Sequence, residues 1–179
     1  MAAHRTVGGT DRGRRWKTQQ LNWSMILRLA GEFQGYTRDL HDLAGEEFVR
    51  RLGSGTPQAD GIITTVLSSG RKLDMGNAQP SSLGSDFARL GVQLWLELGQ
   101  LNPTKAPGWN SDLAALNKAR NAIAHDDTSK MDELKAAGYN LNNITTFKAF
   151  RKCLNELAPA LDSVMAQHLA SVYGSTRPW

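Results

Sequence analysis

The fold is decided by residues 147–164, FKAFRKCLNELAPALDSV, in which large apolar side chains recur every three or four positions. This spacing places six of them on one face of a helix: Phe147, Phe150, Leu154, Leu157, Leu161 and Val164. We predict a helix that begins at Thr145 or Thr146, bends at Pro159 and ends near Gly174. Such a face usually forms the core of a helical bundle, although it could also serve oligomerisation alone.

Two more apolar faces predict long helices. The first, in a helix expected over residues 18–52, comprises Met25, Leu29, Phe33, Tyr36, Leu40 and Leu43. The second predicts one continuous helix from Ser81 or Ser82 to about Leu101, with the face Leu83, Phe87, Leu90, Leu94, Leu98 and Leu101. We expect this second helix to be the central, most deeply buried one.

The remaining segments predict shorter elements. Residues 59–69 are rich in β-branched side chains but have no second strand to pair with, so we predict a short helix, followed by a loop at 70–80. A helix is expected from Asn110 or Ser111 to about His125. Ser129 and Asp132 resemble a capping box for a short helix that ends near Gly138. The predicted fold class is therefore all-α, an up-and-down bundle of four to five main helices.

The length of 179 residues suits a single domain, which we expect over 18–174, between a flexible basic tail at 1–17 and a C-terminal tail at 175–179. Residues 1–17 contain five of the 21 basic residues and one of the 17 acidic residues, so the rest of the chain is balanced at 16 of each. The net charge of +4 therefore belongs to the tail, where it could contact phosphates non-specifically.

Several classes of protein are disfavoured by the sequence. A single cysteine, Cys153, excludes an intrachain disulfide and a multi-cysteine metal site. No signal peptide or membrane-spanning run is present in the sequence, so we expect a cytoplasmic protein without membrane contact. Nucleotide-binding loops and zinc-ligand clusters are missing as well, so we expect no cofactor and no metal. Among the scattered histidines, we expect His41 to face solvent and His168 to be packed or at the rim of the core.

The segment Arg120-Asn121-Ala122-Ile123-Ala124-His125 stands apart from this background. On a helix, Asn121 and His125 lie one turn apart, beyond the edge of the apolar face formed by Leu113, Leu116, Ala119 and Ile123. An arginine can bind a phosphate through its planar fork of donors, and a histidine can exchange protons near neutral pH. These groups suit phosphodiester chemistry on RNA, which carries its own 2′-hydroxyl nucleophile. The alternative is that Arg120 pairs with Asp126 or Asp127 and that His125 merely ends the helix.

Residues 116–125, LNKARNAIAH, resemble the signature of HEPN domains, the higher eukaryote and prokaryote nucleotide-binding fold. The HEPN motif is an arginine, a polar residue that is often asparagine, a few further residues and a histidine. The helical context also resembles that family, most closely the RiboL-PSP branch, from Phe33, Arg38 and Asp39 in the early helix to Leu161 and Asp162 in the last. The resemblance covers about residues 20–173, and its specific part is the six-residue motif.

The resemblance implies a helical bundle that forms a homodimer with both motifs at the interface. It implies a metal-independent endoribonuclease, a hydrolase that often acts as a toxin or in defence, with an antitoxin protein as partner. In that family His125 would be the general base on the 2′-hydroxyl, Arg120 would stabilise the phosphorane, and Asn121 would position substrate or His125. Asn117, Lys118 and Asp126 are weaker candidates for substrate binding.

Two observations keep other hypotheses open. Some toxins of the family carry a tyrosine two residues after the motif histidine, which a partner enzyme modifies, whereas this chain has Asp127 there. The neutral body also offers no obvious basic groove. A non-catalytic HEPN module that binds RNA, nucleotide or a protein partner is therefore the second hypothesis, and an unrelated helical interaction protein is the third.

Overall fold

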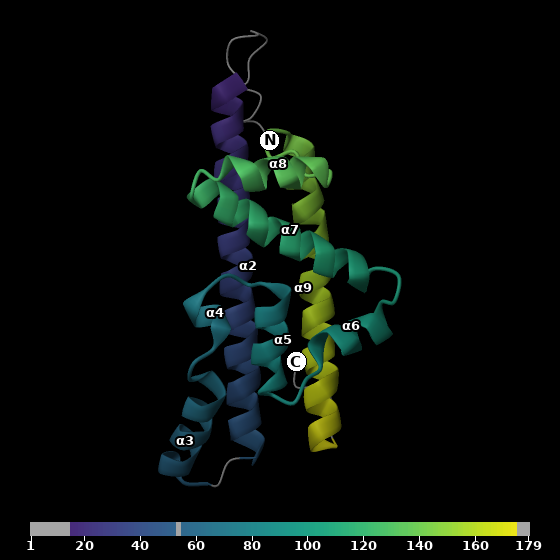
Figure 1. Ribbon diagram of the computed structural model, residues 1–179. Helices are drawn as coiled ribbons and strands as arrows, with labels where there is room; N and C mark the ends of the chain where they lie inside the picture. The colour runs from purple at the N-terminus through teal and green to yellow at the C-terminus, as the bar shows by residue number, and fades with distance from the viewer. Residues whose placement is uncertain (1–14, 53–54, 175–179) are drawn as a thin grey trace.

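The computed structural model describes residues 15–52 and 55–174, and all regular secondary structure in these ranges is α-helix (Figure 1). The predicted all-α bundle is thereby confirmed. The helices are α2 (Arg15–Leu52), α3 (Pro57–Ser68), α4 (Lys72–Met75), α5 (Pro80–Ala88), α6 (Leu94–Leu101), α7 (Ala106–Ala124), α8 (Thr128–Ala136) and α9 (Ile144–Tyr173). Three of them are long, and no helix in the described ranges is long and apolar enough to cross a membrane.

The two longest helices, α2 and α9, lie side by side and run in the same direction, and α7 crosses them (Figure 1). At one end, Asn22 Nδ2 donates to the carbonyl of Asn142, at 2.8 Å. In the middle, Tyr36 Oη donates to Asp162 Oδ1 at 2.9 Å. At the other end, Tyr173 Oη lies 3.5 Å from the carbonyl of Glu47. The parallel pair is the frame on which the other helices pack.

The last helix follows its prediction closely. Asn143 caps it by accepting a hydrogen bond from the backbone N–H of Thr145 at 3.0 Å, so the helix begins at Ile144. The helix continues through Pro159 and ends before Gly174, which adopts the left-handed conformation at φ 59°. The short helix predicted over 59–69 is also present, as α3, and none of its side chains is fully buried.

The continuous helix predicted over 81–101 is wrong, because the chain breaks between α5 and α6. Gly91 has a φ of 82°, which a helix interior does not allow. The neighbouring Leu90 and Val92 are both buried, so the break turns apolar side chains inward rather than exposing them. The apolar periodicity predicted burial correctly for five of its six side chains, since Leu101 is 42% exposed, but it could not predict whether the helix was continuous.

The bounds of two further helices differ from prediction. Helix α7 begins at Ala106 rather than at Asn110 or Ser111, because Pro107 suits the first turn of a helix. Helix α8 is capped by Asp127, which accepts from the backbone N–H of Lys130 at 3.1 Å, and not by Ser129. Short helix α4 also lies in the expected loop at 70–80. The differences at α7 and α8 reflect competition between several residues that can begin a helix.

The expected tails fall mostly outside the described residues. Helix α2 begins at Arg15, three residues before the predicted boundary of the domain, while residues 1–14 and 175–179 are not described.

His41 does not face solvent as predicted. It is buried, with 1% of its surface exposed, and its Nε2 lies 3.1 Å from the carbonyl of Asp86. Its Nδ1 lies 3.1 Å from Nη1 of Arg71, which also forms ion pairs with Asp42 and Asp74. Burial and the neighbouring guanidinium lower the pKa of His41. His168 is half-buried against the carbonyl of Leu90, at 2.8 Å, which agrees with its predicted packing.

Candidate functional site

The six-residue motif, residues 120–125, lies at the C-terminal end of α7, where the buried face of the helix meets the surface. The buried side chains of this helix include Leu113, Leu116, Ala119 and Ala122, and they anchor it against α2 and α9. Arg120 and Asn121 are half-buried at the edge of this face, and His125 is exposed. The helix therefore presents the three polar side chains at a rim, as the helical spacing predicted.

Asn121 is held by two donors. Nη1 of Arg120 donates to Oδ1 of Asn121 at 3.0 Å, and Nδ2 of Asn77 donates to the same oxygen at 2.7 Å. Asn77 lies between α4 and α5, so a segment distant in sequence fixes the orientation of the motif amide. Because Oδ1 is occupied from two sides, the Nδ2 group of Asn121 is the part of the amide that remains for a substrate. Sequence periodicity could not have revealed Asn77, since loop residues leave no repeating pattern.

The predicted alternative pairing of Arg120 does not occur. Within the described ranges, Arg120 forms no ion pair with Asp126 or Asp127. Asp127 instead accepts from Lys130 Nζ at 2.7 Å, and the hydrogen bonds from Lys130 lower the pKa of the Asp127 carboxyl. The Arg120 guanidinium is thus positioned by an amide and not neutralised by a neighbouring carboxylate.

His125 does end the helix, as the alternative also supposed. Its backbone N–H donates to the carbonyl of Asn121 at 3.1 Å, and its φ of −109° departs from the helix. Asp126 follows with a φ of 50°, which turns the chain sharply into α8. The turn leaves the imidazole of His125 exposed, where a substrate or a second protein chain can reach it.

The three weaker candidates occupy different surroundings. Asn117 is buried, and its Nδ2 donates to the carbonyls of Ala78 at 2.9 Å and Leu113 at 2.8 Å, so it holds α7 against the segment before α5. Lys118 pairs with Glu133 of α8 at 2.5 Å. Asp126 is exposed and belongs to the wall of a pocket.

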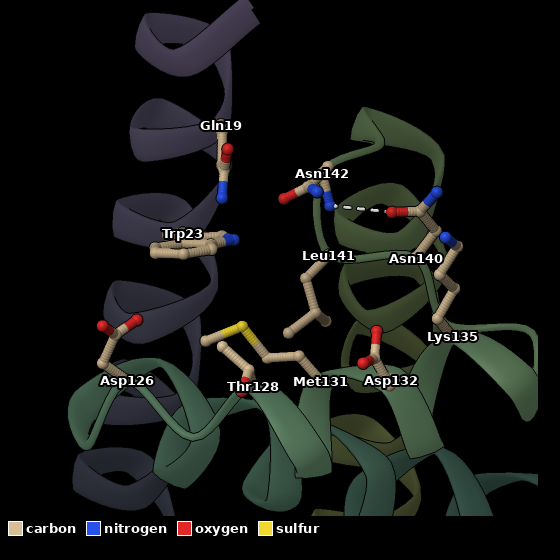
Figure 2. A pocket seen from close by; sticks show the side chains of 10 residues that line it. All are labelled: Gln19, Trp23, Asp126, Thr128, Met131, Asp132, Lys135, Asn140, Leu141 and Asn142. Carbon is tan, nitrogen blue, oxygen red and sulfur yellow. Dashed lines mark hydrogen bonds between the residues drawn. The ribbon is translucent and has the colours of Figure 1, made fainter.

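That pocket was missed by the sequence analysis. Figure 2 shows it between α2, α8 and the connection from α8 to α9. Its cavity volume is about 310 Å³. Its apolar lining is Trp23, Met131 and Leu141, and its polar lining is Gln19, Asp126, Thr128, Asp132, Lys135, Asn140 and Asn142. The only sequence signal was a tryptophan on α2, because the residues come from three segments whose meeting depends on the fold.

The described residues contain no group of three or more histidine, cysteine, aspartate or glutamate side chains arranged to hold a metal ion. Comparison of the chain with models of protein families, with curated proteins and with solved structures finds no match.

Proposed function

We propose that the chain is a metal-independent endoribonuclease of the HEPN type, which cuts RNA by transesterification at the 2′-hydroxyl. The observation that carries the proposal is the state of Arg120, whose guanidinium donates to Asn121, itself held by Asn77, but has no carboxylate partner in the described ranges. A positioned, uncompensated guanidinium at a rim suits a phosphate. The exposed His125 at the same helix end and the resemblance of residues 116–125 to the HEPN signature support the same proposal.

In the proposed reaction, His125 accepts the proton of the 2′-hydroxyl as that oxygen forms a bond to phosphorus. Arg120 stabilises the charge that develops on the phosphorane, and Nδ2 of Asn121 donates to a phosphate oxygen. The bond from phosphorus to the 5′-oxygen then breaks. The products are a 2′,3′-cyclic phosphate and a 5′-hydroxyl, whose oxygen must receive a proton.

The leaving 5′-oxygen needs a general acid, and one chain supplies one motif histidine. A homodimer with both motifs at a twofold axis would supply a second imidazole. The proposal therefore includes a homodimer, and it extends to a toxin or defence role in the cytoplasm with an antitoxin protein as partner.

A non-catalytic module that binds RNA, nucleotide or a protein partner is the second candidate. It is favoured by Asp126, an exposed carboxylate directly after His125 that would repel a phosphate. The balanced charge of the chain beyond residue 17 points the same way, since RNA-binding surfaces are usually basic.

The test is cleavage of RNA in EDTA by the wild type and by His125→Ala, with identification of the RNA ends. Arg120→Ala is compared with Arg151→Ala, which removes an exposed arginine from α9. We expect cyclic phosphate ends from the wild type and from Arg151→Ala. The two motif variants, His125→Ala and Arg120→Ala, should cut at least 100-fold more slowly, because each loses either the catalytic proton acceptor or a donor that stabilises charge. Intact RNA with every protein, alongside retained binding, would favour the second candidate.

A further inference from the structure

We propose that the pocket between α2, α8 and the α8–α9 connection binds one unstacked nucleobase of single-stranded RNA. The inference rests on the proposed function for its choice of RNA, but its chemistry comes from the pocket itself. A cavity of about 310 Å³ lies at the lower end of the range of about 300–1,000 Å³ found for small-molecule sites. The space suits one ring system rather than a folded segment of a protein.

The apolar part of the pocket suits a flat ring. Figure 2 shows the indole of Trp23 lying between α2 and the α8–α9 connection, with Met131 below it and Leu141 opposite. Proteins that bind single-stranded RNA commonly stack unpaired bases on aromatic side chains. Trp23 supplies the aromatic surface, and the other two side chains exclude water from the ring.

The polar part of the pocket favours a base over a phosphate. Asp126 and Asp132 outnumber Lys135, so the charged lining is net negative and would repel an anion. Carboxylates instead accept hydrogen bonds from the exocyclic amino groups of adenine, cytosine and guanine, which uracil lacks. The amides of Gln19 and Asn142 can donate to ring nitrogens or carbonyl oxygens.

One donor at the pocket wall has no acceptor. Nε1 of Trp23 is buried without a hydrogen-bond partner in the described part of the chain, and Figure 2 shows this edge of the ring turned toward Leu141 and Asn142. Buried donors are nearly always paired in folded proteins. A base that offers an acceptor would pair this N–H after a small rotation of the indole, so binding should change the fluorescence of Trp23.

The far wall of the pocket is fixed before any ligand arrives. The carbonyl of Asn140 accepts from Thr146 Oγ1 at 2.8 Å, and the carbonyl of Asn142 accepts from Asn22 Nδ2 at 2.8 Å. The backbone N–H of Asn142 donates to Oδ1 of Asn140 at 3.1 Å, which Figure 2 marks. A wall that is already ordered loses little freedom on binding.

The pocket also lies beside the proposed catalytic residues. Asp126 lines it and directly follows His125, so the wall begins one residue from the imidazole. A base held there would belong to a nucleotide close to the phosphate at Arg120. The pocket would therefore give the nuclease a preference for amino-bearing bases near the cut.

The test measures binding of short single-stranded RNA to protein that carries His125→Ala, so that cleavage does not interfere. Adding Trp23→Ala should weaken binding about 5- to 150-fold, the range that corresponds to loss of one stacked base, while Trp23→Phe should retain most of the affinity. Asp132→Asn should weaken binding of RNA with an amino-bearing base at the relevant position. Asp39→Asn, an exposed aspartate on α2 outside the pocket, is the matched control.

Free adenosine, cytidine and uridine distinguish a base within RNA from a separate nucleotide. We expect the first two to change tryptophan fluorescence at lower concentration than uridine, and an abasic substitution beside the cut to weaken RNA binding as Trp23→Ala does. If free nucleosides bind but the abasic RNA behaves like intact RNA, the assignment to RNA is overturned.

The outcomes separate this inference from the proposed function. If the wild type cuts RNA and neither Trp23→Ala nor Asp132→Asn changes affinity or base preference, the pocket assignment fails while the nuclease stands. If the wild type cuts nothing but the variants weaken RNA binding as expected, the pocket assignment stands while the nuclease fails. A misfolded Trp23→Ala, detected by loss of helical circular dichroism, leaves Trp23→Phe and Asp132→Asn to decide.

Discussion

Nδ2 of Asn77 donates to Oδ1 of Asn121 at 2.7 Å and thereby links the segment before α5 to the motif on α7. The same oxygen accepts from Arg120 at 3.0 Å, so the two residues that would contact a phosphate are oriented through one acceptor. Asn77 is a positioning residue in this arrangement, because it reaches the proposed substrate only through Asn121.

The first prediction concerns this positioning. Asn77→Ala should lower kcat for RNA cleavage while leaving KM nearly unchanged, because the Asn121 amide can then rotate away from the phosphate. Loss of the hydrogen bond should cost about 0.5–1.5 kcal/mol of stability. Steady-state kinetics and urea unfolding measure both effects. Asn155→Ala, which removes an exposed amide from α9, serves as the control: it should leave kcat unchanged and should not lower stability, because alanine favours a helix interior more than asparagine does.

The second prediction concerns the stability of the fold at acidic pH. Because the pKa of His41 is lowered in the folded chain from an ordinary value of 6.5, the unfolded chain binds that proton more readily. The stability due to neutral His41 is therefore present above pH 6.5 and is lost as the pH falls from 6.5 through the lowered folded value.

Urea midpoints at about pH 7.5 and about pH 5 should show this decline. His41→Gln should be less stable at neutral pH but should lose less of its remaining stability on acidification. An identical decline in the variant would mean that the nearby acidic groups, Asp42, Asp74 and Asp86, and not His41, cause the pH dependence.

The third prediction compares two glycines. Gly91→Ala should destabilise the fold by about 1 kcal/mol or more, because φ is 82° there, a backbone conformation that residues with a Cβ rarely adopt. Gly99→Ala, inside α6 with nothing within 4 Å of the added Cβ, should stabilise it by about 0.5–1 kcal/mol. Thermal unfolding of the two variants measures whether each substitution raises or lowers the stability. A stabilising Gly91→Ala would contradict the left-handed break.

The fourth prediction concerns the single thiol. Burial raises the pKa of Cys153 to about 12, and its Sγ lies against the carbonyl of Trp109, at 3.9 Å. Because the thiolate is the reactive form, iodoacetamide should label the native protein slowly and the urea-unfolded protein quickly. Mass spectrometry follows the labelling. Rapid reaction of the native chain would show that α9 is less tightly packed against α7 than the structure indicates.

The sequence predicted what depends on local periodicity. The apolar faces around Phe33 and Leu157 identified α2 and α9, and the helical register placed Arg120 and Asn121 at the edge of the buried face of α7. These features depend on residues three or four positions apart, which a sequence displays directly.

Features that depend on tertiary contact could not be predicted in this way. The burial of His41 comes from Arg71 and Asp86, which lie 30 and 45 residues further along the chain. The Asn77–Asn121 bond spans 44 residues, and the pocket at Trp23 requires α8 and its following connection to reach α2. The break at Gly91 was missed for a different reason, because a left-handed turn that buries leucines leaves the same apolar spacing as an uninterrupted helix.

The parallel pairing of α2 and α9 has a consequence for how the chain folds. The hydrogen bonds that join α2 to α9 and to the residues just before it connect positions 120 to 126 residues apart. Contacts of such sequence separation require closure of a long loop and slow the folding of small domains. During synthesis, α2 emerges from the ribosome with its apolar face uncovered. That face cannot pack against α9 until most of the chain has been synthesised. Nascent α2 is therefore the segment most exposed to premature association. A chaperone would have the largest apolar surface to cover before α9 is synthesised.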